Sequence, residues 1–225
     1  MTLCIIPARS GSKRIKNKNI KNFFGKPLIY YSINLALKSK IFDQVIVSTD
    51  CKKIAKIAKR YGASVPFLRS KKNSDNKTPI NKVLLEVIQK LQMKNKFTFC
   101  IYPTAPMLGL DDLKKGYKKI SNKFDQIVAI SKYSSPIQRA YQKISKNYIK
   151  FINPKYKLYR SQDLNNTYFD SGTFSIYKNS TLLKYEKKNL RIGYIELDKY
   201  TSVDINDEED LKYAKLLFKL KFNVK

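Results

Sequence analysis

Basic and small polar residues crowd the segment that follows the first apolar run of the chain. Residues 8–14 read Ala-Arg-Ser-Gly-Ser-Lys-Arg, and Lys16, Lys18 and Asn19 follow closely. A loop of small residues lets backbone N–H groups approach an anion, and arginine and lysine supply the charge that a polyphosphate requires. Neither GxxxxGK[ST] nor GxGxxG is present. The segment is therefore predicted to be a phosphate-binding loop of another kind, with a solvated basic turn as the alternative.

The densest acidic segment lies near the other end of the chain, where residues 204–210 read Asp-Ile-Asn-Asp-Glu-Glu-Asp. Mg²⁺ takes oxygen ligands and usually binds one or two carboxylates together with substrate phosphates, which makes a carboxylate of this segment a candidate metal ligand. The alternative is that Asn206 or Asp207 caps a helix whose first turn is acidic.

Composition excludes several kinds of chemistry. The 225 residues include no histidine, so a Ser/His/Asp or Cys/His triad and an imidazole zinc site are excluded. The three cysteines form no CxxC pair and are predicted to be reduced core thiols. The net charge is +29, but most of the 46 basic residues are lysines spread along the whole chain. A nucleic-acid-binding module is therefore only an alternative of another class.

The chain shows no signal for a membrane. It has no run of about 18 apolar residues, and its start lacks a basic segment followed by a long apolar stretch. We expect a cytoplasmic protein with neither a membrane nor a nucleic acid as partner.

Regular elements must position the two polar segments. Short apolar runs alternate with amphipathic segments through the first 130 residues, which is typical of β/α units on a mostly parallel sheet. Strands are predicted at Leu3 to Pro7, Gln44 to Ser48, Ser64 to Phe67, Phe97 to Tyr102, Gln126 to Ile130 and Arg191 to Leu197. Helices are predicted at Pro27 to Lys38, at Cys51 to Tyr61 with Asp50 as N-cap, at Thr78 to Met93, from Asp111 onward and at Glu208 to Phe218.

The rhythm changes after residue 131. Two aromatic and β-branched stretches, Arg139 to Ile152 and Thr167 to Tyr177, flank a loop rich in Asn, Pro and Lys. They predict a small antiparallel insertion at about residues 136–177, within a single domain that spans residues 1–225.

Ligands of an open parallel sheet bind beyond the carboxyl ends of its strands. Arg69 lies at the start of one polar segment there, Leu68 to Thr78, and Thr104 and Ala105 lie between two prolines after the strand that ends at Tyr102. Arg69 is one of the few arginines of this lysine-rich chain and lies in a candidate site loop, with a surface arginine as the alternative. Thr104 is a candidate for shaping a pocket, with a plain strand-to-helix turn as the alternative.

Residues 5–14, followed by Lys18 and Asn19, resemble the signature of the CMP-sugar synthetases, which are cytidylyltransferases that activate acidic sugars. Other segments follow in family-like order over essentially the whole chain: Phe24 to Leu28, Val47 to Asp50, Tyr61 to Ala63 and Asp204 to Leu211. Tyr102 to Pro106, Pro136 to Ala140 and Arg160 to Leu164 are most similar to the pseudaminic acid cytidylyltransferases. Phe169 to Phe174 departs from the His-Asp-Ala-Gly-Gln-Phe of that group.

The resemblance implies a three-layer, Rossmann-like α/β nucleotidyltransferase fold whose antiparallel insertion mediates homodimerisation. It implies that the anomeric hydroxyl of an acidic nine-carbon sugar, most closely pseudaminic acid, attacks the α-phosphorus of CTP and releases pyrophosphate, with Mg²⁺ as cofactor. CMP-legionaminic, CMP-sialic and CMP-3-deoxy-octulosonic acid synthetases are the related alternatives.

The resemblance also implies roles for individual residues. The catalytic residues would be Arg9, Lys18 and Asp204. The predicted CTP contacts are Ala8, Arg9, Ser12, Lys13, Lys18, Asn19, Arg69, Thr78, Thr104 and Ala105. The predicted sugar contacts are Gln138, Arg139, Arg160, Ser161, Gln162 and Asp170. An ion pair of Arg160 with Asp163 or Asp170 is the alternative. Asp204 and Asn206 are the predicted metal ligands, with Asn206 where the family carries a second aspartate.

Overall fold

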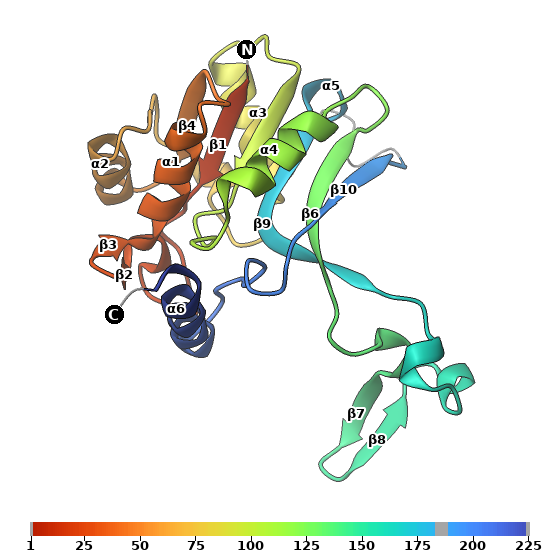
Figure 1. The fold of residues 1–225 in the computed structure, drawn as a ribbon. Helices are drawn as coiled ribbons and strands as arrows, with labels where there is room; N and C mark the ends of the chain where they lie inside the picture. The colour runs from red at the N-terminus through yellow and green to blue at the C-terminus, as the bar shows by residue number, and fades with distance from the viewer. Residues whose placement is uncertain (1, 183–188, 224–225) are drawn as a thin grey trace.

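The computed structural model describes residues 2–182 and 189–223. Its centre is a six-stranded sheet in the order β10-β6-β9-β5-β1-β4 (Figure 1). Parallel pairs join β1 to β4 and β5, and β10 to β6, whereas β9 is antiparallel to both of its neighbours. The strands are β1 (Leu3–Pro7), β4 (Gln44–Ser48), β5 (Phe97–Ile101), β6 (Gln126–Lys132), β9 (Tyr168–Lys178) and β10 (Ile192–Glu196). The predicted mostly parallel sheet is confirmed.

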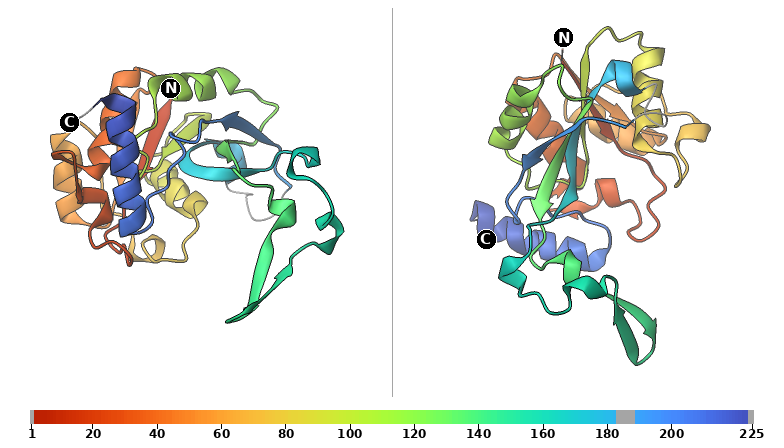
Figure 2. Two further views of the ribbon diagram at one scale, coloured as in Figure 1. Left: turned by 60° about the horizontal axis from the view of Figure 1, so that its bottom comes forward. Right: turned by 90° about the vertical axis from the view of Figure 1, so that its right-hand side faces the viewer.

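Helices cover both faces of the sheet, which gives the three predicted layers (Figure 2). Cys4 and Ile6 of β1 share one core with α1 (Leu28–Ser39), α2 (Lys52–Arg60) and α4 (Leu110–Lys119). Leu3 and Ile5, on the opposite face, pack with α3 (Ile80–Lys90) and α5 (Asn179–Leu182). Successive side chains of a strand point to opposite faces, so an unbroken apolar run is what a strand buried on both faces requires.

A third core fixes α6 (Glu208–Phe222) beside the main sheet. Leu211, Ala214, Leu217 and Phe218 pack against residues of the first loop and of the turn after β5. The 3-10 turn Lys18–Ile20 and the short strands β2 (Asn22–Phe23) and β3 (Lys26–Pro27) lead from the first loop into this core. The N-terminus of α6 is thereby held next to the loop that follows β1.

Residues 133–167, here called the arm, extend away from the sheet between β6 and β9 (Figure 1). The arm contains the hairpin of β7 (Tyr141–Ser145) and β8 (Tyr148–Phe151), and the 3-10 turns Ile137–Arg139, Pro154–Tyr156 and Ser161–Asp163. The prediction that Thr167 to Tyr177 belongs to the insertion is wrong, because these residues form most of β9 in the main sheet. Phe174 and Ile176 are buried on one face of β9 and Ser175 and Tyr177 on the other, as a central strand requires.

Two further predictions are wrong. Ser64 to Phe67 is not a strand, since only Ser64 forms a bridge, to Ile46, and Pro66 has no N–H to donate to a ladder. Asp50 is not the N-cap of α2, because Cys51 holds that position and the Asp50 carboxylate binds Ser10 instead. In the part of the chain that the structure describes, no helix is both long and apolar enough to cross a membrane.

Candidate active site

A cleft of about 480 Å³ opens beyond the carboxyl ends of β1 and β5. Nine of the residues predicted to bind nucleotide or metal line it: Arg9, Ser12, Lys13, Lys18, Asn19, Arg69, Thr78, Thr104 and Asn206. Arg14, Asn73, Asp75, Asn76 and Tyr102 line it as well. The first loop, the turn after β5 and the start of α6 therefore share one site, although they are far apart in the sequence.

The first loop is held in shape by two side chains beneath it. The backbone N–H and the hydroxyl of Ser10 donate to the two carboxylate oxygens of Asp50, each at 2.8 Å. The side-chain amide of Asn19, which is buried, donates to the carbonyl of Arg9 at 2.9 Å. Asn19 thus supports the loop from within and also lines the cleft, as Ser12 and Lys13 do.

Positive charge dominates the cleft. Five basic side chains line it, and Asp75 is the one carboxylate in its described lining; the five are Arg9, Lys13, Arg14, Lys18 and Arg69. The Lys18 ammonium donates to the carbonyl of Ile205 at 2.6 Å. Burial lowers the pKa of Lys18, and the charge of Asp204 opposes that effect. This excess of cations suits a polyanionic ligand such as a triphosphate.

Arg69 is 6% exposed, so the alternative of a surface arginine is wrong. Its Nε donates to the Ser48 hydroxyl at 3.0 Å and its Nη2 to the Ser48 carbonyl, at the end of β4. Burial lowers the pKa of the Arg69 guanidinium, and the negative charge of nearby Asp50 partly opposes this lowering. The group is fixed in one orientation at the floor of the cleft.

Residues 70–78 form the wall opposite the first loop. Buried Glu86 of α3 accepts hydrogen bonds from the backbone and hydroxyl of Ser70 and from Asn73. Across the cleft, Arg9 donates to the side-chain oxygen of Asn76. Of the residues in this wall, only Thr78 is a predicted nucleotide contact. The polar run that precedes Thr78 is the sequence signal that indicates the others as cleft residues.

Asp204 stands beside the cleft. Its Oδ2 accepts from the Asn206 side-chain amide at 2.8 Å, and its Oδ1 from the Thr104 hydroxyl at 3.4 Å. Gly172 of β9 has φ +62°, and a Cβ there would lie 3.2 Å from Cγ of Asp204. The carboxylate of Asp170 accepts from the Gly172 N–H at 2.9 Å. Asp204 and Asp170 are therefore both close to Gly172.

The oxygen atoms here fit Mg²⁺ that is held mainly by substrate phosphates. Mg²⁺ commonly takes only one or two carboxylates beside phosphates and water, and Asp204 is an exposed carboxylate next to the basic cleft. Within residues 2–182 and 189–223, no three carboxylate or cysteine side chains gather into a metal-binding group. The capping alternative is confirmed for Asp207, which accepts from the N–H groups of Glu209 and Asp210.

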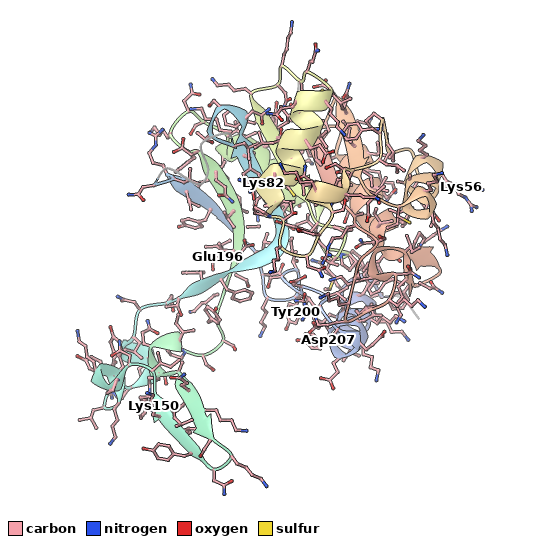
Figure 3. The ribbon with its side chains drawn as sticks, turned by 180° about the vertical axis from the view of Figure 1, so that it is seen from behind. Lys56, Lys82, Lys150, Glu196, Tyr200 and Asp207 are labelled. Carbon is pink, nitrogen blue, oxygen red and sulfur yellow. The ribbon has the colours of Figure 1, made fainter. Side chains whose placement is uncertain are left out.

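The predicted sugar contacts on the arm do not line this cleft. Lys150 of the arm lies well apart from Asp207 at the start of α6 (Figure 3). Ser161 and Gln162 line a separate cavity of about 460 Å³ within the arm. Arg160 pairs with Asp163 at 2.9 Å, so the ion-pair alternative is confirmed. Gln138 donates to the carbonyl of Asn165, and Arg139 to the hydroxyl of Ser161.

Two predicted nucleotide contacts, Ala8 and Ala105, are buried in the main core. The Ala8 N–H donates to the carbonyl of Ser48 at 2.9 Å, and the Ala105 N–H to the carbonyl of Tyr102 at 3.3 Å. Their small side chains pack beneath the loop and the turn that line the cleft.

Known proteins share both the sequence pattern and the fold. The family model described as Cytidylyltransferase matches residues 3–220. The chain is 40% identical to the pseudaminic acid cytidylyltransferase of Campylobacter jejuni subsp. jejuni serotype O:2, over 97% of this chain and 96% of that protein. It is 35% identical to the CMP-N,N'-diacetyllegionaminic acid synthase of Legionella pneumophila, over 59% of this chain and 58% of that protein.

A solved CMP:2-keto-3-deoxy-manno-octonic acid synthetase in complex with CTP superposes on the structure with a TM-score of 0.75. The alignment covers 98% of this chain and 99% of that one, at 16% identity. At that identity the likeness concerns the fold.

Proposed function

The chain belongs to the cytidylyltransferase family, and from that premise we propose that it transfers CMP from CTP to a nonulosonic acid, specifically pseudaminic acid. The observation that carries the proposal is the basic cleft, which gathers five cationic side chains beyond the ends of β1 and β4 and lies next to Asp204. In the reaction the anomeric hydroxyl oxygen bonds to the α-phosphorus, the bond from that phosphorus to the bridging oxygen breaks, and pyrophosphate leaves.

The basic side chains would carry most of the catalysis. Arg9, Lys13 and Lys18 line the cleft where the first loop can receive a triphosphate, and negative charge grows on the leaving pyrophosphate as its bond breaks. Their positions are set before ligand arrives, because Asp50 and Asn19 hold the loop and Ile205 anchors Lys18. Arg69 would present a fixed guanidinium edge to the nucleotide.

Asp204 would hold Mg²⁺, assisted by the phosphates of CTP. When bound, such an ion would neutralise phosphate charge and make the attacking hydroxyl more acidic. Thr104 and Asn206 orient the Asp204 carboxylate through one hydrogen bond to each of its oxygens. No histidine exists in the chain to serve as the base.

We also propose that the arm joins two copies of the chain. It exposes Tyr148, Ile149 and Ile152 by more than half, and Leu158 by 91%. Since Gln138, Arg139, Ser161 and Gln162 lie away from the cleft of their own chain, they would reach a sugar only in the cleft of a partner copy.

We place the reaction in the cytoplasm.

The experiment is a pyrophosphate-release assay with purified protein, CTP, Mg²⁺ and pseudaminic acid. Legionaminic, sialic and 3-deoxy-octulosonic acids test the related alternatives. Arg9→Ala should abolish turnover while Arg60→Ala, an exposed arginine of α2, should not. If no sugar gave pyrophosphate release, the proposal would be refuted. If only another sugar were turned over, that sugar would be the substrate and pseudaminic acid would not. A DNA and RNA binding assay at physiological salt tests the nucleic-acid alternative.

A further inference from the structure

Arg14 and Asn206 meet at the cleft although 192 positions separate them. Nη2 of Arg14 donates to Oδ1 of Asn206 at 2.8 Å. The other end of the same amide donates from Nδ2 to Oδ2 of Asp204 at 2.8 Å. One side chain thus connects the first loop to the candidate metal ligand.

The two partners dictate which way the amide points. A guanidinium only donates hydrogen bonds and an ionised carboxylate only accepts them. The oxygen of Asn206 must therefore face Arg14, and its NH₂ must face Asp204. Aspartate at position 206 could accept from Arg14 but could not donate to Asp204, and it would set two carboxylates side by side.

The backbone around Asn206 is also fixed. Its N–H donates to Oδ2 of Asp210 at 2.8 Å, inside the capping turn of α6. The carbonyl of the preceding residue, Ile205, accepts from Lys18, and the Ile205 side chain is fully buried. Arg14 and Lys18 therefore bind one short segment at adjacent residues, which joins the first loop to the start of α6.

We propose that Asn206 is a positioning residue that couples Arg14 to Asp204, and that Arg14, oriented in this way, is a further contact for the phosphates of CTP. The inference rests on the proposed function. It replaces the expectation that Asn206 is a metal ligand. Oδ1, the atom that would coordinate, is uncharged and accepts from the Arg14 guanidinium, whose positive charge disfavours a cation at the same atom. Asp204 is then the one metal ligand that we propose in the segment 204–206.

A double-mutant cycle tests the coupling. The CTP affinity of each variant is measured by calorimetry, with Mg²⁺ present and sugar absent. Arg14→Gln and Asn206→Ala should each weaken CTP binding about tenfold, since each removes a hydrogen bond that involves a charged group. The double variant should bind CTP no more weakly than the weaker single variant. Effects that multiply in the double variant would overturn the proposal. Arg60→Gln and Asn122→Ala, both at exposed positions, are the matched controls.

The Mg²⁺ concentration at half-maximal CTP binding tests the metal assignment. CTP is set at the dissociation constant of each variant. The Mg²⁺ concentration should then rise about tenfold in Asp204→Ala, which loses the ligand, and only about twofold in Asn206→Ala, which keeps the carboxylate but loses one hydrogen bond to it. An equal rise in both variants would make Asn206 a ligand and overturn the proposal. Wild-type protein that binds no CTP would refute the proposed function itself, whereas CTP binding without coupling would refute only this inference.

Discussion

The carboxylate of Asp50 accepts both hydrogen bonds that Ser10 can donate, one from the backbone N–H and one from the hydroxyl, each at 2.8 Å. Asp50 follows β4, and Ser10 follows the neighbouring strand β1. Two adjacent parallel strands therefore fix the loop between them without any ligand. A loop that is already ordered loses less conformational entropy when a ligand binds, and the ligand therefore binds more tightly.

Asp50→Ala should weaken CTP binding about tenfold, because Ser10 loses both acceptors and the first loop loses its preferred shape. Asp50→Asn keeps one acceptor oxygen and should be intermediate. Calorimetry with CTP and Mg²⁺ measures the effect, and Asp111→Ala, an exposed acid in the first turn of α4, is the control. Unchanged affinity in Asp50→Ala would contradict the role of the carboxylate.

Arg69→Lys should lower both stability and CTP affinity. Lysine keeps the charge but cannot make the two hydrogen bonds to Ser48 from one planar group, and the site is buried. We expect a loss of about 1–3 kcal/mol in the free energy of unfolding, measured by urea denaturation. If Arg69→Lys had the stability and CTP affinity of wild type, the positive charge alone would account for the role of Arg69. Arg60→Lys is the exposed control.

Stability should depend on Glu86 at low pH. Burial raises the pKa of Glu86, but hydrogen bonds from Lys90, Asn73 and Ser70 outweigh it and hold the pKa at about 2, below its usual value of 4.5. A lowered folded-state pKa stabilises the fold fully above pH 4.5, and this contribution is lost as pH falls toward 2. It amounts to about 3 kcal/mol.

Glu86→Gln tests this pH dependence. The difference in unfolding free energy between wild type and Glu86→Gln should be largest at pH 7 and should shrink between about pH 4.5 and pH 3. Urea denaturation at several pH values measures it, with Glu196→Gln at an exposed site of β10 as the control. A difference that does not vary with pH would contradict the assignment.

Gly172→Ala should raise the Mg²⁺ requirement of CTP binding. Its φ of +62° disfavours alanine by about 1–2 kcal/mol, and the new Cβ would press on the Asp204 carboxylate. Gly25→Ala is a close match, because Gly25 has φ +75° but open space where its Cβ would lie. Both variants should lose stability in thermal unfolding, and only Gly172→Ala should alter the Mg²⁺ titration. A parallel change in both would assign the effect to backbone strain.

Ile149→Asp should separate the proposed dimer. Ile149 is 55% exposed on β8, and burying a new carboxylate in an apolar interface is unfavourable. Analytical ultracentrifugation should show a dimer for wild type and a monomer for the variant. Turnover of the sugar should fall while CTP binding persists, because the cleft lies outside the arm. Leu110→Asp, an exposed position of α4, is the control. A monomeric wild type would refute the dimer.

The strands β1 and β4 match their predicted bounds, since their apolar runs are buried and end at polar loops. The partner of residues 167–177 was not predictable in the same way. Their aromatic and β-branched composition indicates a strand, but a strand's neighbours are chosen by the packing of the whole sheet. Phe174 and Ile176 pack against α4 and β5 rather than against the hairpin nearest in sequence.

In the site, too, local features could be predicted from the sequence and long-range contacts could not. The first loop was predicted because its charge and its place after β1 are local features. Asp50 was misassigned because an aspartate before a helix suits an N-cap as well as a distant partner such as Ser10. Asn73 and Asn76 are not among the predicted site residues. Their wall is anchored by Glu86 of α3, and the hydrogen bonds from Ser70 and Asn73 to Glu86 form only in the folded chain.

The place of β9 in the sheet has a consequence for synthesis. Within the described sheet, β10-β6 and β5-β1-β4 are joined through β9 alone. While the chain emerges from the ribosome, the first half of the sheet can pair early, but β6 has no neighbour until residues 168–178 appear. Until then both β5 and β6 present an open edge, the kind of surface on which nascent chains aggregate. The arm is thus translated during the most vulnerable interval of folding.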